Sequence, residues 1–137
     1  MSNQAPSDVV IRAHSKNVVQ FYDTHPINEQ QIMEKLSQDG VDLSTLTEEI
    51  LQAYDMDHYD GVGATDKLAE VAGVSADSHV LDVASGMGGP ARYLAHNYGC
   101  RVTGIDLTES RVAGATRLTA LTGQSDRVDF RATNALE

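Results

Sequence analysis

The spacing of apolar residues along the chain changes once, near residue 75. Before that point they recur every three or four positions, as in amphipathic helices, and after it short β-branched runs alternate with helical stretches. Asn28 is placed to cap a helix that Gly40 stops, and Gly73 is placed to end the last helix of the first part. This part therefore predicts four helices, within residues 7–22, after residue 28, and at about 47–54 and 62–72.

From His79 onward the pattern predicts strands and helices in alternation. The strands are expected at 79–84, 101–106 and 127–133, and the helices between them at 91–97 and 109–122. Because the connections are short, right-handed crossovers should join the strands into a parallel sheet. The fold class is therefore α/β: the first three strands of a Rossmann-like, doubly wound parallel sheet, preceded by an N-terminal helical cap. We place the cap at residues 1–60 and the sheet domain at 61–137.

A glycine-rich turn follows the first strand directly, with the sequence Ala-Ser-Gly-Met-Gly-Gly at residues 84–89. Ligands of such sheets bind at this end of the strands. Gly86 and Gly88 can adopt backbone angles denied to other residues, and would let a ligand approach the main chain closely. Asp106 ends the second strand, where an acidic side chain can accept hydrogen bonds from both ribose hydroxyls. Together the turn and the acid indicate a ligand that contains adenosine.

The spacing alone leaves two classes of cofactor open. Gly86, Gly88 and Ala91 also satisfy the Gly-x-Gly-x-x-Gly/Ala pattern of dinucleotide sites. Asp82, within the strand just below the turn, suits an ammonium group better than a phosphate. Pro90 removes an amide that would otherwise face an anion. These two residues favour S-adenosyl-L-methionine over NAD(P), without deciding between them.

The run from Asp82 to Gly89 resembles the first motif of class I S-adenosylmethionine-dependent methyltransferases, and residues 102–108 resemble their second-strand motif. The sequences at residues 88–95 and 99–108, around these two motifs, are similar to those of the small-molecule branch of the family. This branch includes sarcosine and dimethylglycine, tocopherol and quinone-precursor methyltransferases. The resemblance runs from about residue 55 to the end of the chain. It implies in-line transfer of a methyl group to a small-molecule acceptor, for which the protein supplies proximity and orientation.

The resemblance also implies roles for individual residues. Around the methionyl part of the cofactor it places Asp82, Ser85, Gly86 and Gly88. Asp106 would hold the ribose diol, and Leu107 would pack on the adenine. Asn134 would accept from the adenine amino group, with the Ala135 amide beside it. The sequence departs from the family's pattern at Asn134, which replaces a common aspartate, and at Ala84, which replaces the first glycine of the motif.

The segment from Tyr54 to Gly61 forms a second polar cluster. One interpretation folds it over the cofactor, with His58 and Tyr59 lining the site and His58 as the candidate catalytic base. The other is a helix terminus with solvated acids and an aromatic residue packed on the core. The acids do not follow EF-hand spacing and the histidines show no ligand spacing, so we expect no metal site. Cys100 is expected to be a small buried residue.

Charge and length complete the expectations. Ten Lys and Arg stand against 20 Asp and Glu, a net charge of -10, which disfavours nucleic acid and anionic membranes as partners. A cytoplasmic protein is expected, since the apolar stretches are well short of the roughly 20 residues that span a bilayer and the first ten residues lack the basic and apolar regions of a signal peptide. The sequence ends just after the third strand, so we interpret it as the N-terminal half of a methyltransferase domain. Self-association or a completing chain is then expected at the open edge of that strand. The alternatives are an NAD(P)-dependent oxidoreductase fragment and a non-catalytic cofactor-binding subunit.

Overall fold

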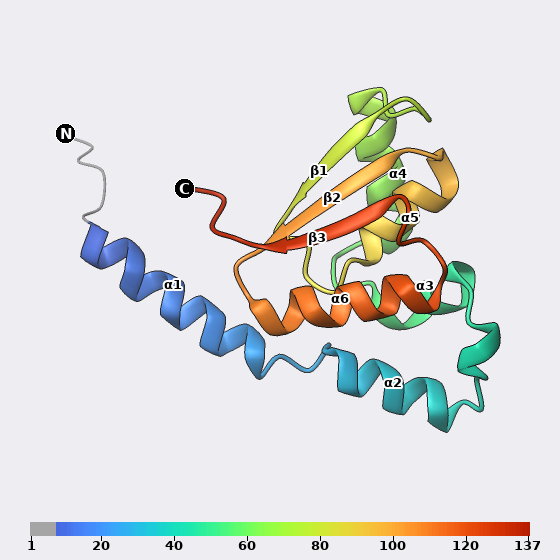
Figure 1. Cartoon of the computed structure of the whole chain (residues 1–137), viewed down its shortest axis with the longest axis horizontal. Coiled ribbons are helices and arrows are strands. Elements are labelled where there is room, and N and C mark those ends of the chain that lie inside the picture. The colour runs from blue at the N-terminus through green and yellow to red at the C-terminus, as the bar shows by residue number, and fades with distance from the viewer. Residues whose placement is uncertain (1–7) are drawn as a thin grey trace.

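The computed structural model describes residues 8–137, with side chains from residue 12 onward. Its elements in chain order are α1 (Asp8–Asp23), α2 (Glu29–Gln38), the 3-10 turn η1 (Leu43–Thr45), α3 (Glu48–Asp55), α4 (Gly61–Ala72), β1 (His79–Val83), α5 (Gly89–Tyr98), β2 (Arg101–Asp106), α6 (Glu109–Leu121) and β3 (Val128–Ala132) (Figure 1). The prediction of these helices and strands is confirmed to within one or two residues at each end, except that η1 was not expected. Residue 7, where the first helix was allowed to begin, lies outside the described residues.

Local capping explains why the helix ends could be predicted. The Asn28 side chain accepts a hydrogen bond from the Gln31 backbone amide at 3.0 Å and begins α2. Gly73 ends α4 with a φ of 67°, in the left-handed region that other residues avoid. Each such cap is worth about 1 kcal/mol and depends only on neighbouring residues. Within the described part of the chain, no helix combines the length and hydropathy that crossing a membrane requires.

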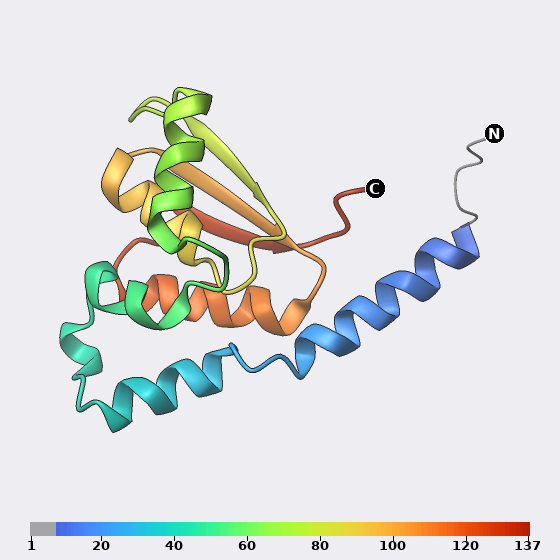
Figure 2. The ribbon, with the colours of Figure 1, turned by 180° about the vertical axis from the view of Figure 1, so that it is seen from behind.

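The three strands form a parallel sheet in the order β1-β2-β3, which confirms the α/β fold class. Val80 pairs in register with Val102, and Val102 with Val128. These valines face α5, which contributes Ala91 and Leu94 to the same apolar cluster. The helix lies behind the sheet in Figure 1 and in front of it, beside α4, in Figure 2. Cys100 is fully buried in this cluster, as predicted.

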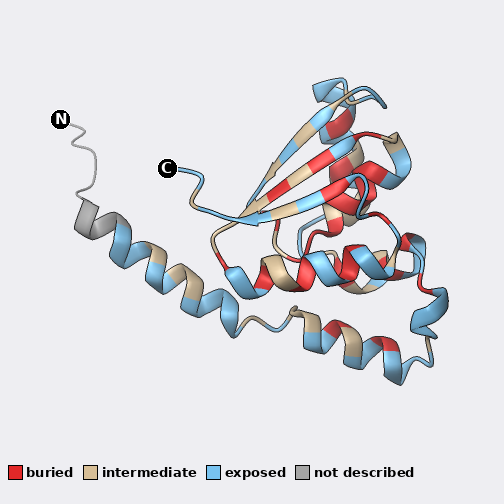
Figure 3. Ribbon diagram, viewed as in Figure 1, coloured by how far each residue is buried: buried red, intermediate tan, exposed pale blue. Residues whose placement is uncertain are grey.

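The opposite face of the sheet carries no helix in the described part of the chain (Figure 1). Along β1, exposed and half-buried residues alternate, and Leu81 and Val83 are 60% and 54% exposed. Figure 3 shows this strand in the colours of exposed and intermediate residues. The expected open edge at the third strand is confirmed, because β3 lies at one side of the sheet. The other edge strand is β1, and its exposed apolar residues were not anticipated.

The cap packs against the sheet domain through a second apolar cluster. It joins residues of α2, η1 and α3 to the glycine turn and α6, and its buried members are Ile32, Leu36, Leu46, Leu51, Met87 and Leu118. Gly114 on α6 permits this contact, because a Cβ there would lie 2.6 Å from the Met87 Cε atom. The cap is thereby held against the end of the sheet where the glycine turn lies.

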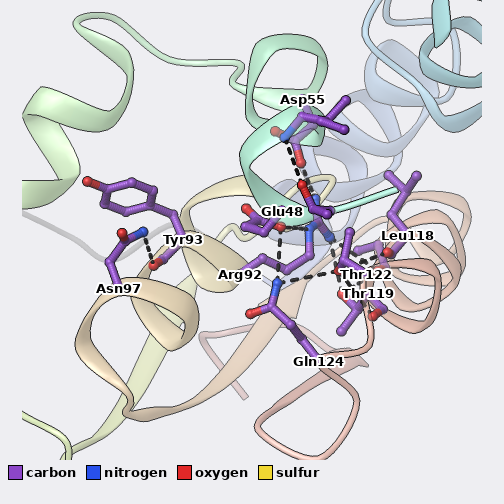
Figure 4. Close-up of polar contacts among 12 residues, drawn as sticks. Glu48, Asp55, Arg92, Tyr93, Asn97, Leu118, Thr119, Thr122 and Gln124 are labelled. Atoms are coloured by element: carbon purple, nitrogen blue, oxygen red, sulfur yellow. Dashed lines mark hydrogen bonds and ion pairs between the residues drawn. The ribbon is translucent and has the colours of Figure 1, made fainter. Parts of the chain in front are cut away.

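A buried polar network crosses the same interface (Figure 4). Arg92 on α5 is fully buried and forms ion pairs with Asp55 and Glu48, both on α3. Its guanidinium also donates to Thr119 Oγ1 at 3.2 Å, and Gln124 donates to Glu48 Oε2 at 3.1 Å. We call these five residues the Arg92 network.

The Arg92 network holds one guanidinium between two buried carboxylates. Burial raises the pKa of Glu48 to about 8, and the Arg92 charge only partly offsets that effect. Burial also raises the pKa of Asp55. Because one cation only partly compensates two buried anions, Glu48 keeps its proton to a higher pH than a solvated glutamate does.

Candidate functional site

A cavity of about 250 Å³ lies at the carboxyl ends of β1 and β2, between the glycine turn and the cap. The turn contributes residues 84–87 and the end of β2 contributes the next side. From the cap come Tyr22, Asp57 and His58. Of the residues singled out from the sequence, the structure brings together at this cavity Ser85, Gly86, Asp106, Leu107 and His58.

Asp106 ties the glycine turn to β2. Its Oδ2 atom accepts from the Gly86 amide at 2.8 Å, and its Oδ1 atom accepts from the Thr108 amide at 2.9 Å. A carboxylate oxygen has room for a second hydrogen bond, so Asp106 can still accept from a ligand on both atoms. The side chain thus shapes the turn and at the same time presents acceptors to the cavity.

Ala84 opens the turn with a φ of 61°, one of two non-glycine residues with positive φ among residues 8–137. A Cβ in this conformation costs about 1 kcal/mol or more. This is the position where the sequence departs from the glycine of the motif that it resembles. The turn keeps its shape here at the expense of backbone strain.

Gly88 does not line the cavity. A Cβ at this position would lie 2.4 Å from Phe130 Cζ and 2.9 Å from Arg92 Nη1. Its φ of 80° adds a second reason for glycine. In this structure Gly88 is therefore needed for packing between the turn, α5 and β3, rather than for the close approach of a ligand that the sequence suggested.

Asp82 lies on β1 and lines a second cavity of about 480 Å³ between β1 and α4. His58, Ala84 and Pro90 line both cavities, so the two adjoin. Burial, together with the negative charge of Asp106, raises the pKa of Asp82 to about 6. The Asp82 Oδ2 and Ser85 Oγ atoms are buried and have no hydrogen-bond partner among the described residues. Unpartnered polar atoms of this kind indicate a place where a ligand can supply the missing bonds.

His58 and Tyr59 are neighbours in the turn before α4, and of the two only His58 lines the cavities. The His58 Nδ1 atom lies 3.0 Å from the Tyr59 carbonyl oxygen, which can only accept, so Nδ1 carries the proton. The Nε2 atom lies 3.5 Å from Thr65 Oγ1. Tyr59 is 97% exposed and lines neither cavity, which corrects the expectation that it lines the site.

Asn134 and Ala135 follow β3 and lie outside the cavity. The Asn134 side chain accepts from the Leu136 amide at 3.0 Å and donates to Glu137 at 3.4 Å. Its carbonyl oxygen is therefore engaged within its own turn. The adenine contact that we expected for these residues stays a prediction.

The sequence analysis missed Arg111, which lines the cavity from the first turn of α6. Arg111 is 4% exposed, donates to Asp57 Oδ2 at 3.0 Å and to the Ile27 carbonyl oxygen at 3.0 Å, and lies over the Tyr22 ring at 5.2 Å. The position of Arg111 in the first turn of α6 was a signal in the sequence. A cation there is disfavoured by the helix dipole, so it indicates a stabilising partner elsewhere in the fold. The partners that stabilise Arg111, Asp57 and Ile27, are distant in the sequence.

Comparison with known proteins agrees with this geometry. Residues 80–137 match the model of a methyltransferase domain. Over these residues, which are fewer than half of the chain, the sequence is similar to methyltransferase domains. The sarcosine/dimethylglycine N-methyltransferase of Halorhodospira halochloris is 61% identical over 33 residues, which are 24% of this chain and 12% of that protein. The segments shared with this and two other curated relatives span 12% to 31% of their lengths.

Two solved structures are similar in fold to this chain. An RNA methyltransferase from Salinibacter ruber, in complex with S-adenosyl-L-homocysteine, is 28% identical with a TM-score of 0.52, over 55% of this chain and 49% of that one. The [4+2]-cyclase SpnF has a TM-score of 0.62 at 23% identity, over 90% of this chain and 43% of that one. The second likeness shows the fold alone, and its name shows that this fold also serves other chemistry.

Proposed function

We propose that this chain binds S-adenosyl-L-methionine at the glycine turn and that the protein transfers its methyl group to a small molecule. The observation that carries the proposal is the pairing of Asp106 with the Gly86 amide beside a cavity, next to buried atoms of Asp82 and Ser85 that lack partners. The family match to a methyltransferase domain supports it. The same features disfavour NAD(P), because an unpartnered carboxylate oxygen beside the turn would repel a pyrophosphate.

The residues of the two adjoining cavities would each meet one group of the cofactor. Asp106 would accept from the ribose hydroxyls, and Leu107 would pack against the adenine. Asp82 would face the methionyl ammonium, with Ser85 and the Gly86 backbone beside it. Asn134 and Ala135 would reach the adenine after a rearrangement of the C-terminal turn. The cofactor supplies a methyl group that is already activated for displacement.

For the transfer itself the chain supplies proximity, orientation and exclusion of water. The cap covers the cavity, with Tyr22 and Asp57 at its border. His58 is placed to accept a proton from a methyl acceptor that must lose one, because its side chain lines the cavity.

A small-molecule acceptor is favoured by the charge of the chain. A net charge of -10 opposes the binding of nucleic acid, although one structural relative is an RNA methyltransferase. Relatives named for sarcosine, dimethylglycine and tocopherol support a small molecule. A non-catalytic cofactor-binding subunit is the alternative, and a cytoplasmic location stays a prediction from the sequence.

Isothermal titration calorimetry of the full 137-residue chain with S-adenosyl-L-homocysteine tests the proposal, with NAD as the comparison ligand. Saturable binding of the homocysteine compound is expected, and Asp106→Ala should weaken it at least about tenfold, since hydrogen bonds to a charged group are lost. Asp129→Ala is the matched control, because Asp129 is an exposed carboxylate on the neighbouring strand β3, away from the cavity. Binding of NAD alone would contradict the cofactor assignment.

A further inference from the structure

The cavity contains an unexpected cation. Among its lining residues, all of them described, Arg111 is the single lysine or arginine, and the charged side chains around it are Asp55, Asp57 and Asp106. A guanidinium that is 4% exposed loses most of its hydration, so it requires compensating acceptors. The acceptor that would compensate it best is an anion seated in the cavity.

Two of the guanidinium nitrogens of Arg111 face the glycine turn. A Cβ on Gly86 would lie 3.1 Å from Nη2 and 3.6 Å from Nε, so this edge of the guanidinium borders the position where a ligand meets the turn. The Nη2 and Nε atoms together form the edge that binds a carboxylate with two parallel hydrogen bonds. Nε has no hydrogen-bond partner among the described residues, and Nη2 is held by Asp57 alone.

Asp57 uses only part of the hydrogen-bonding capacity of the Nη2–Nε edge of Arg111. Its side chain is 30% exposed, and it contacts only Nη2, at 3.0 Å. It belongs to the turn between α3 and α4 and also lies 3.7 Å from His25 Nδ1. A ligand carboxylate that contacts both Nη2 and Nε would form one more charge-assisted bond than Asp57 does.

We propose that Arg111 is the carboxylate-binding residue of this cavity and that Asp57 occupies the position until a ligand carboxylate replaces it. The inference rests on the proposed function and deepens it. The carboxylate can come from the methionyl part of the cofactor or from the methyl acceptor, and in both cases the same edge of the guanidinium binds it. Asp57 is then a competitor of the ligand rather than part of its binding site.

The competition makes the test specific, because the two partners should have opposite effects. S-adenosyl-L-homocysteine carries a carboxylate and an ammonium group, and 5′-methylthioadenosine is the same nucleoside thioether without either, so only the carboxylate can account for an effect of Arg111 on the first ligand alone. If Arg111 binds the carboxylate of the cofactor, Arg111→Gln should weaken the binding of S-adenosyl-L-homocysteine about ten- to a hundredfold. The affinity for 5′-methylthioadenosine should stay unchanged. Asp57→Asn should strengthen binding of the homocysteine compound roughly threefold or more, because the competitor is removed. A purely structural Arg111–Asp57 pair predicts weaker binding of both nucleosides in both variants.

Arg117→Gln is the matched control. Arg117 lies on the same helix and also pairs with the cap, through Glu29, but its side chain is 60% exposed and it does not line the cavity. Binding of both nucleosides should therefore be unchanged in this variant. The control separates loss of a cap contact from loss of the carboxylate partner.

A second arm identifies an acceptor carboxylate. The chain saturated with 5′-methylthioadenosine is titrated with glycine and with acetate, and binding that Arg111→Gln abolishes and Asp57→Asn strengthens assigns the position to the acceptor. No effect of either variant in both arms, with methylthioadenosine still bound, overturns the carboxylate proposal and leaves the cofactor proposal intact. If the unmodified chain binds neither nucleoside, both proposals fail.

Discussion

Two buried arginines connect the helical cap to the sheet domain, and they differ in how completely they are partnered. Arg92 is fully enclosed and contacts two carboxylates that are themselves buried. Arg111 is almost as buried, yet its one carboxylate partner is partly exposed, and its guanidinium borders a cavity. Arg92 is thus fully used in contacts between the cap and the sheet domain, whereas Arg111 keeps a hydrogen-bond donor available to a ligand.

The difference has a physical basis in desolvation. In the Arg92 network every charged group has lost its water, so the ion pairs must compensate one another within the protein. Around Arg111, Asp57 can return to water when another anion arrives, which costs little. Burial of the arginine alone therefore does not distinguish a structural ion pair from one that a ligand can replace. The exposure of the carboxylate partner makes this distinction.

Removal of Arg92 should have the largest effect. Arg92→Met leaves Glu48 and Asp55 buried without a cation, which is expected to lower the free energy of unfolding by about 3–5 kcal/mol. Arg111→Met is the matched comparison and should cost about 1 kcal/mol, because Asp57 can be solvated. Urea denaturation followed by circular dichroism measures both. Equal losses in the two variants would remove the distinction between the arginines.

The proton on Glu48 should make stability depend on pH. Its pKa is about 8 in the folded chain against a reference value of 4.5, so the folded state binds the extra proton and unfolding releases it. Stability should fall as pH rises from about 4.5 to 8, by on the order of 2 kcal/mol between pH 6 and pH 8. Glu48→Gln, which keeps the shape of the protonated acid, should remove most of this dependence and leave the smaller contributions of Asp55 and Asp82. A Glu48→Gln variant whose unfolding free energy follows the same pH curve as the unmodified chain would contradict the assignment.

Ala84→Gly should have the smallest effect and the opposite sign. Glycine relieves the positive φ of this position but adds freedom to the unfolded chain, so a net gain of about 0.5–1 kcal/mol in unfolding free energy is expected. Thermal unfolding monitored by calorimetry measures it. Gly73→Ala provides the reverse comparison, since it places a Cβ at a φ of 67° with no other atom within 4 Å, and should destabilise. A loss of stability in Ala84→Gly would show that the cavity border is not strained.

Much of the fold could be predicted because its signals are local. Asn28 and Gly73 set helix ends through contacts within a few residues. Val80 and Val102 belong to short β-branched runs, and the helical stretches between such runs indicate parallel strands. Asp106 could be placed beside the glycine turn for the same reason, since both lie at the ends of neighbouring parallel strands.

The rest depends on contacts between residues that are far apart in the chain. Arg92 meets Asp55 across 37 positions, and Arg111 meets Asp57 across 54. Glu48 and Asp55 lie about two helical turns apart on one face, but no local pattern shows that this face is buried. The orientation of Tyr59 and the packing role of Gly88 were likewise decided by the turn before α4 and by Phe130.

The sequence by itself determined the order of helices and strands, the parallel sheet and the glycine turn followed by an acid, because caps, periodicity and turn geometry act over a few residues. Only the tertiary structure decided which charges lose their water. Desolvation depends on what the cap covers, and it alone separates Arg92, enclosed between two carboxylates, from Arg111, whose guanidinium borders the cavity.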